Sequence, residues 1–95
     1  MRVGFLRAGV STPLILATTG TERMRITTAG NVGIGTTSPA YKFNVSNNDA
    51  EGFEFRPGNT SNINILQNYN RATSVYTTLD LRASDFYLKM ELLLL

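Results

Sequence analysis

The sequence predicts an all-β chain, and two observations carry the prediction. Apolar and polar residues alternate with a period of two in one segment after another, which is the pattern of strands that bury one face. Threonine (12 residues), asparagine (9) and glycine (8) are abundant, a balance typical of strands joined by tight turns. Apolar residues do not follow the three- and four-residue spacing of an amphipathic helix, so we predict no helix.

Residues 21–92 carry the alternation, whereas residues 1–20 give a weaker signal. In that first stretch, Leu14-Ile15-Leu16 is either a strand or part of an earlier repeat. Glycine, proline, asparagine and aspartate fall between the later sets and predict the turns. The apolar members of the sets are Met24 and Ile26; Val32 and Ile34; Tyr41, Phe43 and Val45; Phe53 and Phe55; Ile63 and Ile65; Val75, Thr77, Leu79 and Leu81; and Phe86, Leu88, Met90 and Leu92.

The last two sets differ in parity, with odd numbers up to Leu81 and even numbers from Phe86. A slip of one residue turns the following side chains to the other face of a sheet. We therefore predict a turn or bulge at Ala83-Ser84-Asp85 and a β-meander over residues 51–92, which carries most of the aromatic residues.

Glycine occupies alternate positions in Val32-Gly33-Ile34-Gly35. A glycine inside a strand costs about 0.5–1 kcal/mol relative to alanine, and its usual reason is the close approach of another backbone. Pro39 ends this segment, because proline lacks the N–H that a sheet needs. The simplest explanation is a glycine-rich hairpin in a monomeric sandwich, and the alternative is contact between chains.

The segment TERMRITTAGNVGIGTTSPAYKFNV, residues 21–45, is the most specific feature of the chain. It resembles, nearly residue for residue, a repeat of bacteriophage tail fibres and related virion fibres, ERMRIT-x-AGNVGIGTTSP-x-x-K followed by a hydrophobic residue, any residue and valine. The resemblance implies short strands in a trimeric, intertwined β shaft of a virion. It identifies a building block and no ligand.

In this family the repeat often precedes a self-cleaving chaperone domain that opens with Ser-Asp and Leu-Lys. Ser84-Asp85 and Leu88-Lys89 echo that opening, but Tyr87 stands where a basic residue is expected, and only six residues follow Lys89. We therefore expect a turn at Ser84-Asp85 and no chaperone domain in this chain.

A trimer agrees with the size of the chain. A domain of 95 residues is marginally stable alone, and the sequence contains neither cysteine for disulfides nor histidine for a zinc site. Oligomerisation is the remaining way to stabilise it. The resemblance then implies that Val32, Ile34, Phe43 and Val45 form the trimer core and that Gly33 and Gly35 pack closely where chains touch or turn.

Three segments follow from these patterns. Residues 1–20 form an N-terminal segment or the end of an earlier repeat, and residues 21–45 form the shaft repeat. Residues 46–95 contain the β-meander, which forms a tip or an attachment region.

Composition argues against several classes of partner. The net charge is +2 with single, scattered lysines and arginines, so we expect no nucleic-acid binding. Leu92–Leu95 is far shorter than the roughly 20 apolar residues of a membrane span, so we predict a last strand or a chain end and no membrane insertion. No secretory signal is evident at the N-terminus.

The sequence also lacks the combinations of residues that are typical of catalytic sites. Glu51 and Glu54 are the best candidates for a glycosidase pair, but strand alternation places them on opposite faces. Gly33-x-Gly35 lacks the remaining residues of a phosphate-binding loop, and Ser84 has no base beside it. We expect no enzymatic activity, no catalytic residues, no metal and no cofactor.

The sequence thus predicts a structural subunit of a homotrimeric virion fibre or fibre base, in contact with other virion proteins and located in the virion. One alternative is a tip that binds a host glycan or protein. Its candidate surface residues are Tyr69, Tyr76, Tyr87, Arg71 and Arg82. A second alternative is a fragment of a capsule-degrading tailspike.

Overall fold

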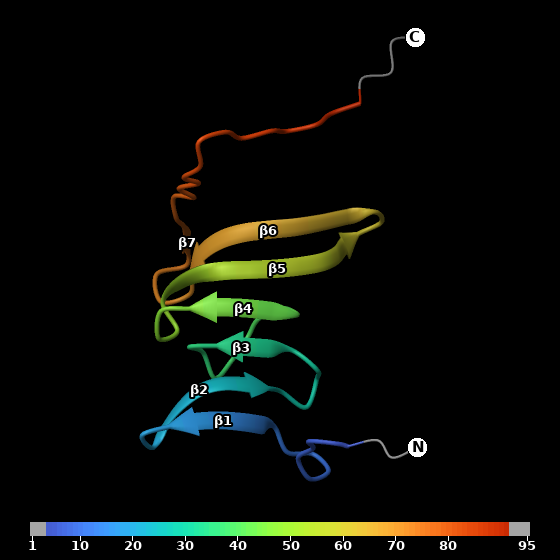
Figure 1. The fold of residues 1–95 in the computed structure, drawn as a ribbon, viewed down its shortest axis with the longest axis vertical. Coiled ribbons are helices and arrows are strands. Elements are labelled where there is room, and N and C mark those ends of the chain that lie inside the picture. Colours follow the sequence, from blue (N-terminus) through green and yellow to red (C-terminus); the bar gives the residue numbers. More distant parts are fainter. Residues whose placement is uncertain (1–3, 92–95) are drawn as a thin grey trace.

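The computed structural model describes residues 4–91 and forms one sheet of seven strands, ordered in space as along the chain (Figure 1). The strands are β1 (Leu14–Thr18), β2 (Thr21–Ile26), β3 (Val32–Ile34), β4 (Phe43–Ser46), β5 (Glu51–Thr60), β6 (Ile63–Asn70) and β7 (Val75–Tyr76). The described residues contain no helix, which confirms the all-β prediction. Among them there is therefore no helix that could span a bilayer.

Tight turns join most neighbouring strands, and the turn residues explain them. Thr19 and Gly20 connect β1 to β2 with φ values of 52° and 70°. Two consecutive positive φ values are the signature of the hairpin turn that matches the twist of a sheet. Asn62, with φ of 63°, lies in the corresponding turn between β5 and β6.

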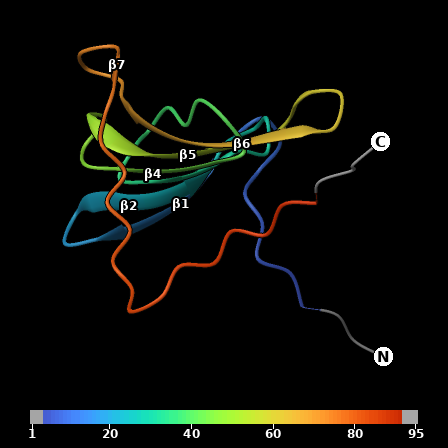
Figure 2. The same ribbon diagram turned by 90° about the horizontal axis from the view of Figure 1, so that it is seen from above.

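The only parallel pair of strands in the described sheet is β3 with β4. Their connection, residues 35–42, crosses over one face of the sheet, and Figure 2 shows connecting loops rising on one side of the strands. Thr36 and Pro39 of this crossover are buried against the sheet. The crossover therefore covers part of the face on which Gly33 lies.

The sheet is a single layer and has no hydrophobic core within residues 4–91. Apart from Pro39 in the crossover, none of the described aliphatic or aromatic side chains is buried, whereas the polar residues Thr36, Asn44 and Glu54 are. Glu54 has the largest fully buried side chain, at 2% exposure. The part of the chain that the structure describes thus encloses a polar centre and leaves its apolar side chains partly exposed.

The C-terminal part differs from the prediction. Of the strands predicted over 75–82 and 86–92, only Val75–Tyr76 forms, and residues 77–91 run without strand structure beyond the sheet (Figure 1). A strand needs a hydrogen-bonded neighbour, and within the described chain β7 pairs only with β6. Ser84 forms a bend at the predicted change of parity, and Leu92–Leu95 lie outside the described residues.

The register of β6 also differs from expectation. Ile65 pairs with Arg56 and Leu66 pairs with Phe55, in the register that runs unbroken from the pair of Glu51 and Asn70. Ile65 therefore projects to the side of Arg56 and Leu66 to the side of Phe55, while the β-bulge between Arg56 and Thr60 shifts only the pairing nearer the turn.

The sheet runs continuously through the three predicted segments. The boundary between residues 20 and 21 falls inside the β1–β2 hairpin, and the boundary between 45 and 46 falls inside β4. Hydrogen bonds between neighbouring strands therefore join the N-terminal residues, the repeat and β5–β7 into one unit.

Candidate functional site

Apolar side chains from six neighbouring strands share one face of the sheet. Paired residues on adjacent strands project to the same face, so the register assigns every side chain. This surface, called here the apolar face, consists of eleven side chains in two rows: Leu14, Ile26, Val32, Phe43, Phe55 and Leu66 in one, and Leu16, Met24, Ile34, Val45 and Phe53 in the other.

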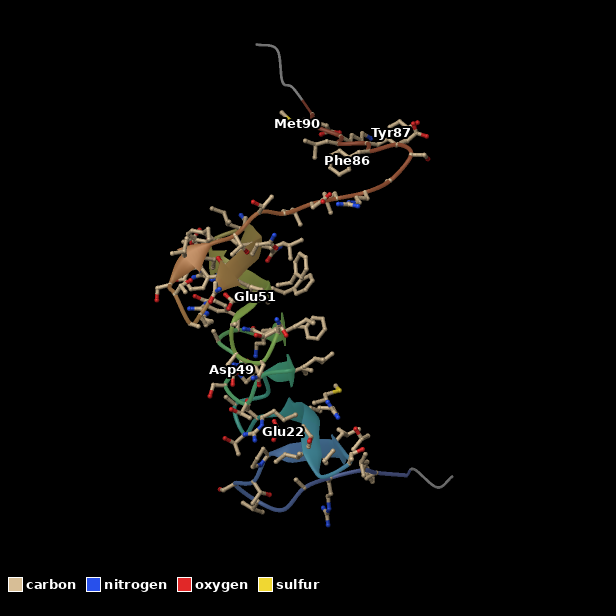
Figure 3. All side chains as sticks on the ribbon, turned by 90° about the vertical axis from the view of Figure 1, so that its left-hand side faces the viewer. Glu22, Asp49, Glu51, Phe86, Tyr87 and Met90 are labelled. Atoms are coloured by element: carbon tan, nitrogen blue, oxygen red, sulfur yellow. The ribbon has the colours of Figure 1, made fainter. Side chains whose placement is uncertain are left out.

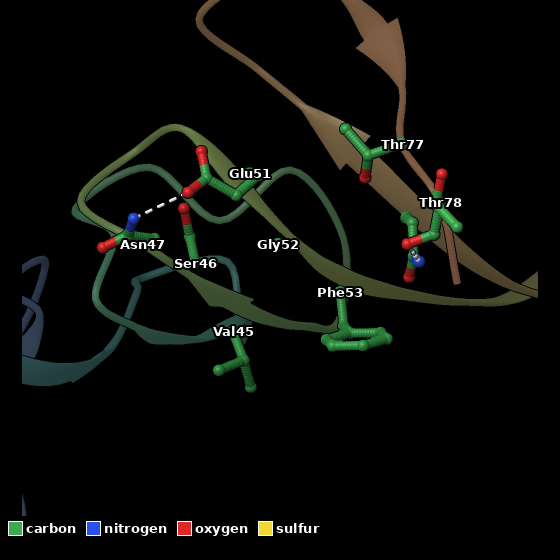
Figure 4. Close-up of a pocket in the computed structure, with 9 residues that line it drawn as sticks. Val45, Ser46, Asn47, Glu51, Gly52, Phe53, Thr77 and Thr78 are labelled. Atoms are coloured by element: carbon green, nitrogen blue, oxygen red, sulfur yellow. Dashed lines mark hydrogen bonds between the residues drawn. The ribbon is translucent and has the colours of Figure 1, made fainter. Parts of the chain in front are cut away.

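The four residues predicted for the trimer core lie in the middle of the apolar face. Val32 pairs with Phe43, and Ile34 pairs with Val45, across the parallel strands. Phe43 stacks on Phe55 of the next strand, with ring centroids 5.3 Å apart. Figure 4 shows Val45 and Phe53, another cross-strand pair, pointing to the same side of the sheet.

This face is open to solvent in the single chain. Ile34 is 37% exposed, Phe55 40% and Leu66 53%. Monomeric proteins rarely expose contiguous apolar patches of more than a few hundred Å², and larger ones mark sites of association. The apolar face is therefore the strongest candidate for an interaction surface.

Gly33 and Gly35 pack closely, but against their own chain. A Cβ on Gly33 would lie 2.9 Å from the carbonyl oxygen of Thr36 and 3.2 Å from Cδ of Pro39, both in the crossover. Gly35 has φ of 74°, and its Cβ would collide with the carbonyl oxygen of Ser46. The crowding predicted between chains is thus already present within one chain, from the crossover at Gly33 and from the end of β4 at Gly35.

The opposite face is organised around the carboxylate of Glu54. It accepts hydrogen bonds from Nδ2 of Asn44 at 3.2 Å, Nε2 of Gln67 at 2.6 Å and Nε of Arg71 at 2.6 Å. Arg71 donates a second bond through Nη2, which makes the ion pair bidentate. Three strands and the turn after β6 are thereby joined at one buried group.

The charges of this network depend on each other. Burial alone would raise the pKa of Glu54, but hydrogen bonds from Arg71 and Gln67 and the charges of Arg71 and Arg56 outweigh it and lower that pKa. The hydrogen bond to Glu54 in turn raises the pKa of Arg71. Both groups are therefore ionised at neutral pH.

Arginines and tyrosines surround this network. The guanidinium carbon of Arg71 lies 4.3 Å from the ring centre of Tyr69, and the Tyr69 and Tyr76 rings meet edge to face at 5.1 Å. Arg56 lies over Tyr41 at 4.2 Å. The structure thus brings together three of the predicted surface residues, Arg71, Tyr69 and Tyr76, and adds Tyr41 and Arg56.

The other two predicted surface residues lie elsewhere. Arg82 pairs with Asp80 at 2.9 Å within the extended C-terminal part. Tyr87 is 88% exposed and lies far along the same part, next to Phe86 and away from the sheet (Figure 3). The five residues therefore do not form one surface in the described chain.

Tyr41 and Arg56 were missed because their positions depend on register. In the sequence Tyr41 alternates with Phe43 and Val45 and is expected on the apolar face. The chain bends at Tyr41 and Lys42 before β4 begins, and the bend turns Tyr41 toward Arg56. The one available signal was the pair of polar positions Glu54 and Arg56 on the same side of a predicted strand.

The carboxylates do not assemble into a catalytic or metal site among residues 4–91. Glu51 pairs with Asn70 and Glu54 pairs with Gln67 three positions further along the same strand, so the two carboxylates project to opposite faces, as the alternation predicted. Glu51 instead accepts a hydrogen bond from Asn47 at 2.7 Å (Figure 4). No group of three potential metal ligands occurs in the described residues.

Comparisons of the chain with protein-family models, curated proteins and solved structures found no match.

Proposed function

We propose that the chain is a structural subunit of a homotrimeric virion fibre, in which the apolar face is covered by the same face of two further copies. The observation that carries this proposal is the continuous apolar face on a single-layer sheet without a hydrophobic core. Association would supply the core that the described part of one chain lacks.

The energies favour association. Full burial of a large apolar side chain contributes about 1.5–3 kcal/mol, so covering the exposed part of eleven side chains, roughly a third of each, contributes roughly 5–10 kcal/mol per chain. This is comparable to the free energy of unfolding of a whole small domain. It exceeds the lower estimates of the free-energy cost of association, which begin at about 4 kcal/mol.

The number of copies and the location rest on the resemblance of residues 21–45 to the fibre repeat. A one-sided apolar sheet packs equally well in other symmetric assemblies, whereas the repeat is typical of trimeric shafts. In a fibre, three sheets around one axis give a stiff rod whose polar faces are turned outward. Such a rod holds a terminal domain away from the particle or attaches it to other virion proteins.

The enzymatic alternative gains no site from the geometry, because Glu51 and Glu54 lie on opposite faces. The binding alternative is favoured by one observation, the group of arginines and tyrosines around Glu54. That group lies on the face opposite the apolar face, so a structural role and a binding role are compatible.

Thiol reactivity tests whether the apolar face is covered. The chain contains no cysteine, so Val45→Cys places a single thiol on this face, and Ala17→Cys places one at an exposed position of β1 on the opposite face, the side of Ile15. We expect a maleimide to label Ala17→Cys rapidly and Val45→Cys at least about tenfold more slowly, with equal rates in denaturant. Equal rates in the native protein would contradict the proposal.

A further inference from the structure

A hollow lies beside Arg56, at the end of the sheet where the crossover meets β5. Its volume is about 350 Å³, and we call it the Arg56 hollow. The crossover contributes Ala40, Tyr41 and Lys42, and the bulged part of β5 contributes Arg56 through Asn59. Asn31, whose Nδ2 donates to the carbonyl oxygen of Pro39 at 3.5 Å, completes the lining.

Positive charge is in excess at this hollow. Arg56 and Lys42 line it, and its lining includes no carboxylate. Arg56 also lowers the pKa of Glu54, but that carboxylate already receives a bidentate pair from Arg71. The two cations of the lining thus face no carboxylate within the hollow.

Arg56 is held in place without being neutralised. Its guanidinium lies over the ring of Tyr41 at 4.2 Å, and its Nη2 donates to Oδ1 of Asn59. Its Nε is buried and has no hydrogen-bond partner in the described chain, and Arg56 takes part in none of the ion pairs found there. A cation fixed by stacking and lacking a counter-ion is suited to bind an anion, since little side-chain freedom is lost on binding.

The remaining lining indicates which anion fits. The side-chain amides of Asn31 and Asn59 offer both donors and acceptors, the groups that hydroxyls require. The volume is at the lower end of the roughly 300–1,000 Å³ of small-molecule sites, which suits a single sugar ring better than a bare ion. Nucleic acid fits less well, because its backbone requires a row of cations and the sequence has only scattered ones.

We propose that the Arg56 hollow binds an acidic saccharide, with the sugar carboxylate held by Arg56 and Lys42 and its hydroxyls by the two asparagines. Arg56 shares the face of Glu54, opposite the apolar face. The arginine of the hollow therefore lies on the face that the proposed assembly leaves uncovered. The inference goes beyond the proposed function and uses none of the apolar-face residues, so the two ideas fail separately.

Isothermal titration of the full chain at low salt with trigalacturonate tests the inference, with galactotriose as the neutral counterpart and inorganic phosphate as the bare anion. We expect saturable binding of one trigalacturonate per chain. Losing the carboxylate contact removes a charge-assisted interaction, so galactotriose should bind at least about tenfold more weakly. Phosphate should bind more weakly as well, because it cannot use the asparagines.

Matched variants locate the site. Arg56→Gln should weaken trigalacturonate binding at least about tenfold, and Arg82→Gln, which alters an exposed arginine far from the hollow, should leave it within about twofold. If Arg56→Gln does not fold, the trigalacturonate affinity of Lys42→Gln provides the test of the site instead. Absence of saturable binding, equal affinity for phosphate or galactotriose, or unchanged affinity in both hollow variants would overturn the inference.

Discussion

Phe43 and Phe55 stack on neighbouring antiparallel strands with ring centroids 5.3 Å apart, and Phe55 nevertheless remains 40% exposed. The same arrangement of good cross-strand contacts and poor coverage extends over the whole apolar face. Contacts within the sheet align these side chains, and a second layer is required to remove them from water.

A charge on the apolar face should prevent assembly. Ile34→Asp places a carboxylate in the centre of this face, where covering it costs several kcal/mol in every chain. Ile15→Asp is the matched control, because Ile15 lies in β1 on the opposite face beside Arg25 and is 44% exposed. Size-exclusion chromatography should show loss of the assembly for the first variant only. Equal elution of both would mean that the inner face is assigned incorrectly.

Gly35→Ala should destabilise the sheet itself. The added Cβ would collide with the backbone of Ser46, and φ of 74° disfavours any side chain. We expect a loss of at least about 2 kcal/mol in the free energy of unfolding, measured by denaturant titration. Gly4→Ala is the proper control, because open space surrounds Gly4 and its φ is not positive. Gly58 is unsuitable as a control, because its φ of 66° is itself disfavoured by alanine.

Removing the charge of Glu54 should also destabilise the chain. Glu54→Gln breaks a buried ion pair with Arg71 and replaces an acceptor of four hydrogen bonds by an amide, at a cost of about 2 kcal/mol. Asp80→Asn removes the carboxylate of an exposed pair and should cost less than about 0.5 kcal/mol. Unfolding midpoints in urea compare the two, and similar values would show that the Glu54 network is dispensable.

The same network makes stability dependent on pH. The pKa of Glu54 is lowered in the folded chain from an ordinary value of 4.5. Its contribution is therefore complete above pH 4.5 and is lost as the pH falls through the lower, folded pKa. Denaturant midpoints of the wild type should decline below pH 4.5, and those of Glu54→Gln should decline less. Parallel declines would place the acid sensitivity elsewhere.

Much of the fold could be predicted because alternation is a local property. Met24, Ile34, Val45 and Phe53 each occupy the apolar position of their own strand, and the register only aligns them. Which strands pair is a property of the whole chain. The sequence therefore did not predict the parallel pairing of β3 with β4 or the close fit of Gly33 under the crossover.

The polar site was harder to predict, because residues distant in sequence form it. Glu54 meets Arg71 across 17 positions, and the bend at Tyr41 reverses the side suggested by its parity. Alternation at Leu79, Leu81, Phe86 and Leu88 predicted strands that the described chain does not form. Alternation states that a segment can pair, and the partner must come from elsewhere.

The mass of the native protein in solution tests the central claim most directly. Sedimentation equilibrium at micromolar concentration should give three times the single-chain mass of 10.5 kDa, without folded monomer. A stable, folded species of single-chain mass would contradict the claim that the apolar face is buried by association.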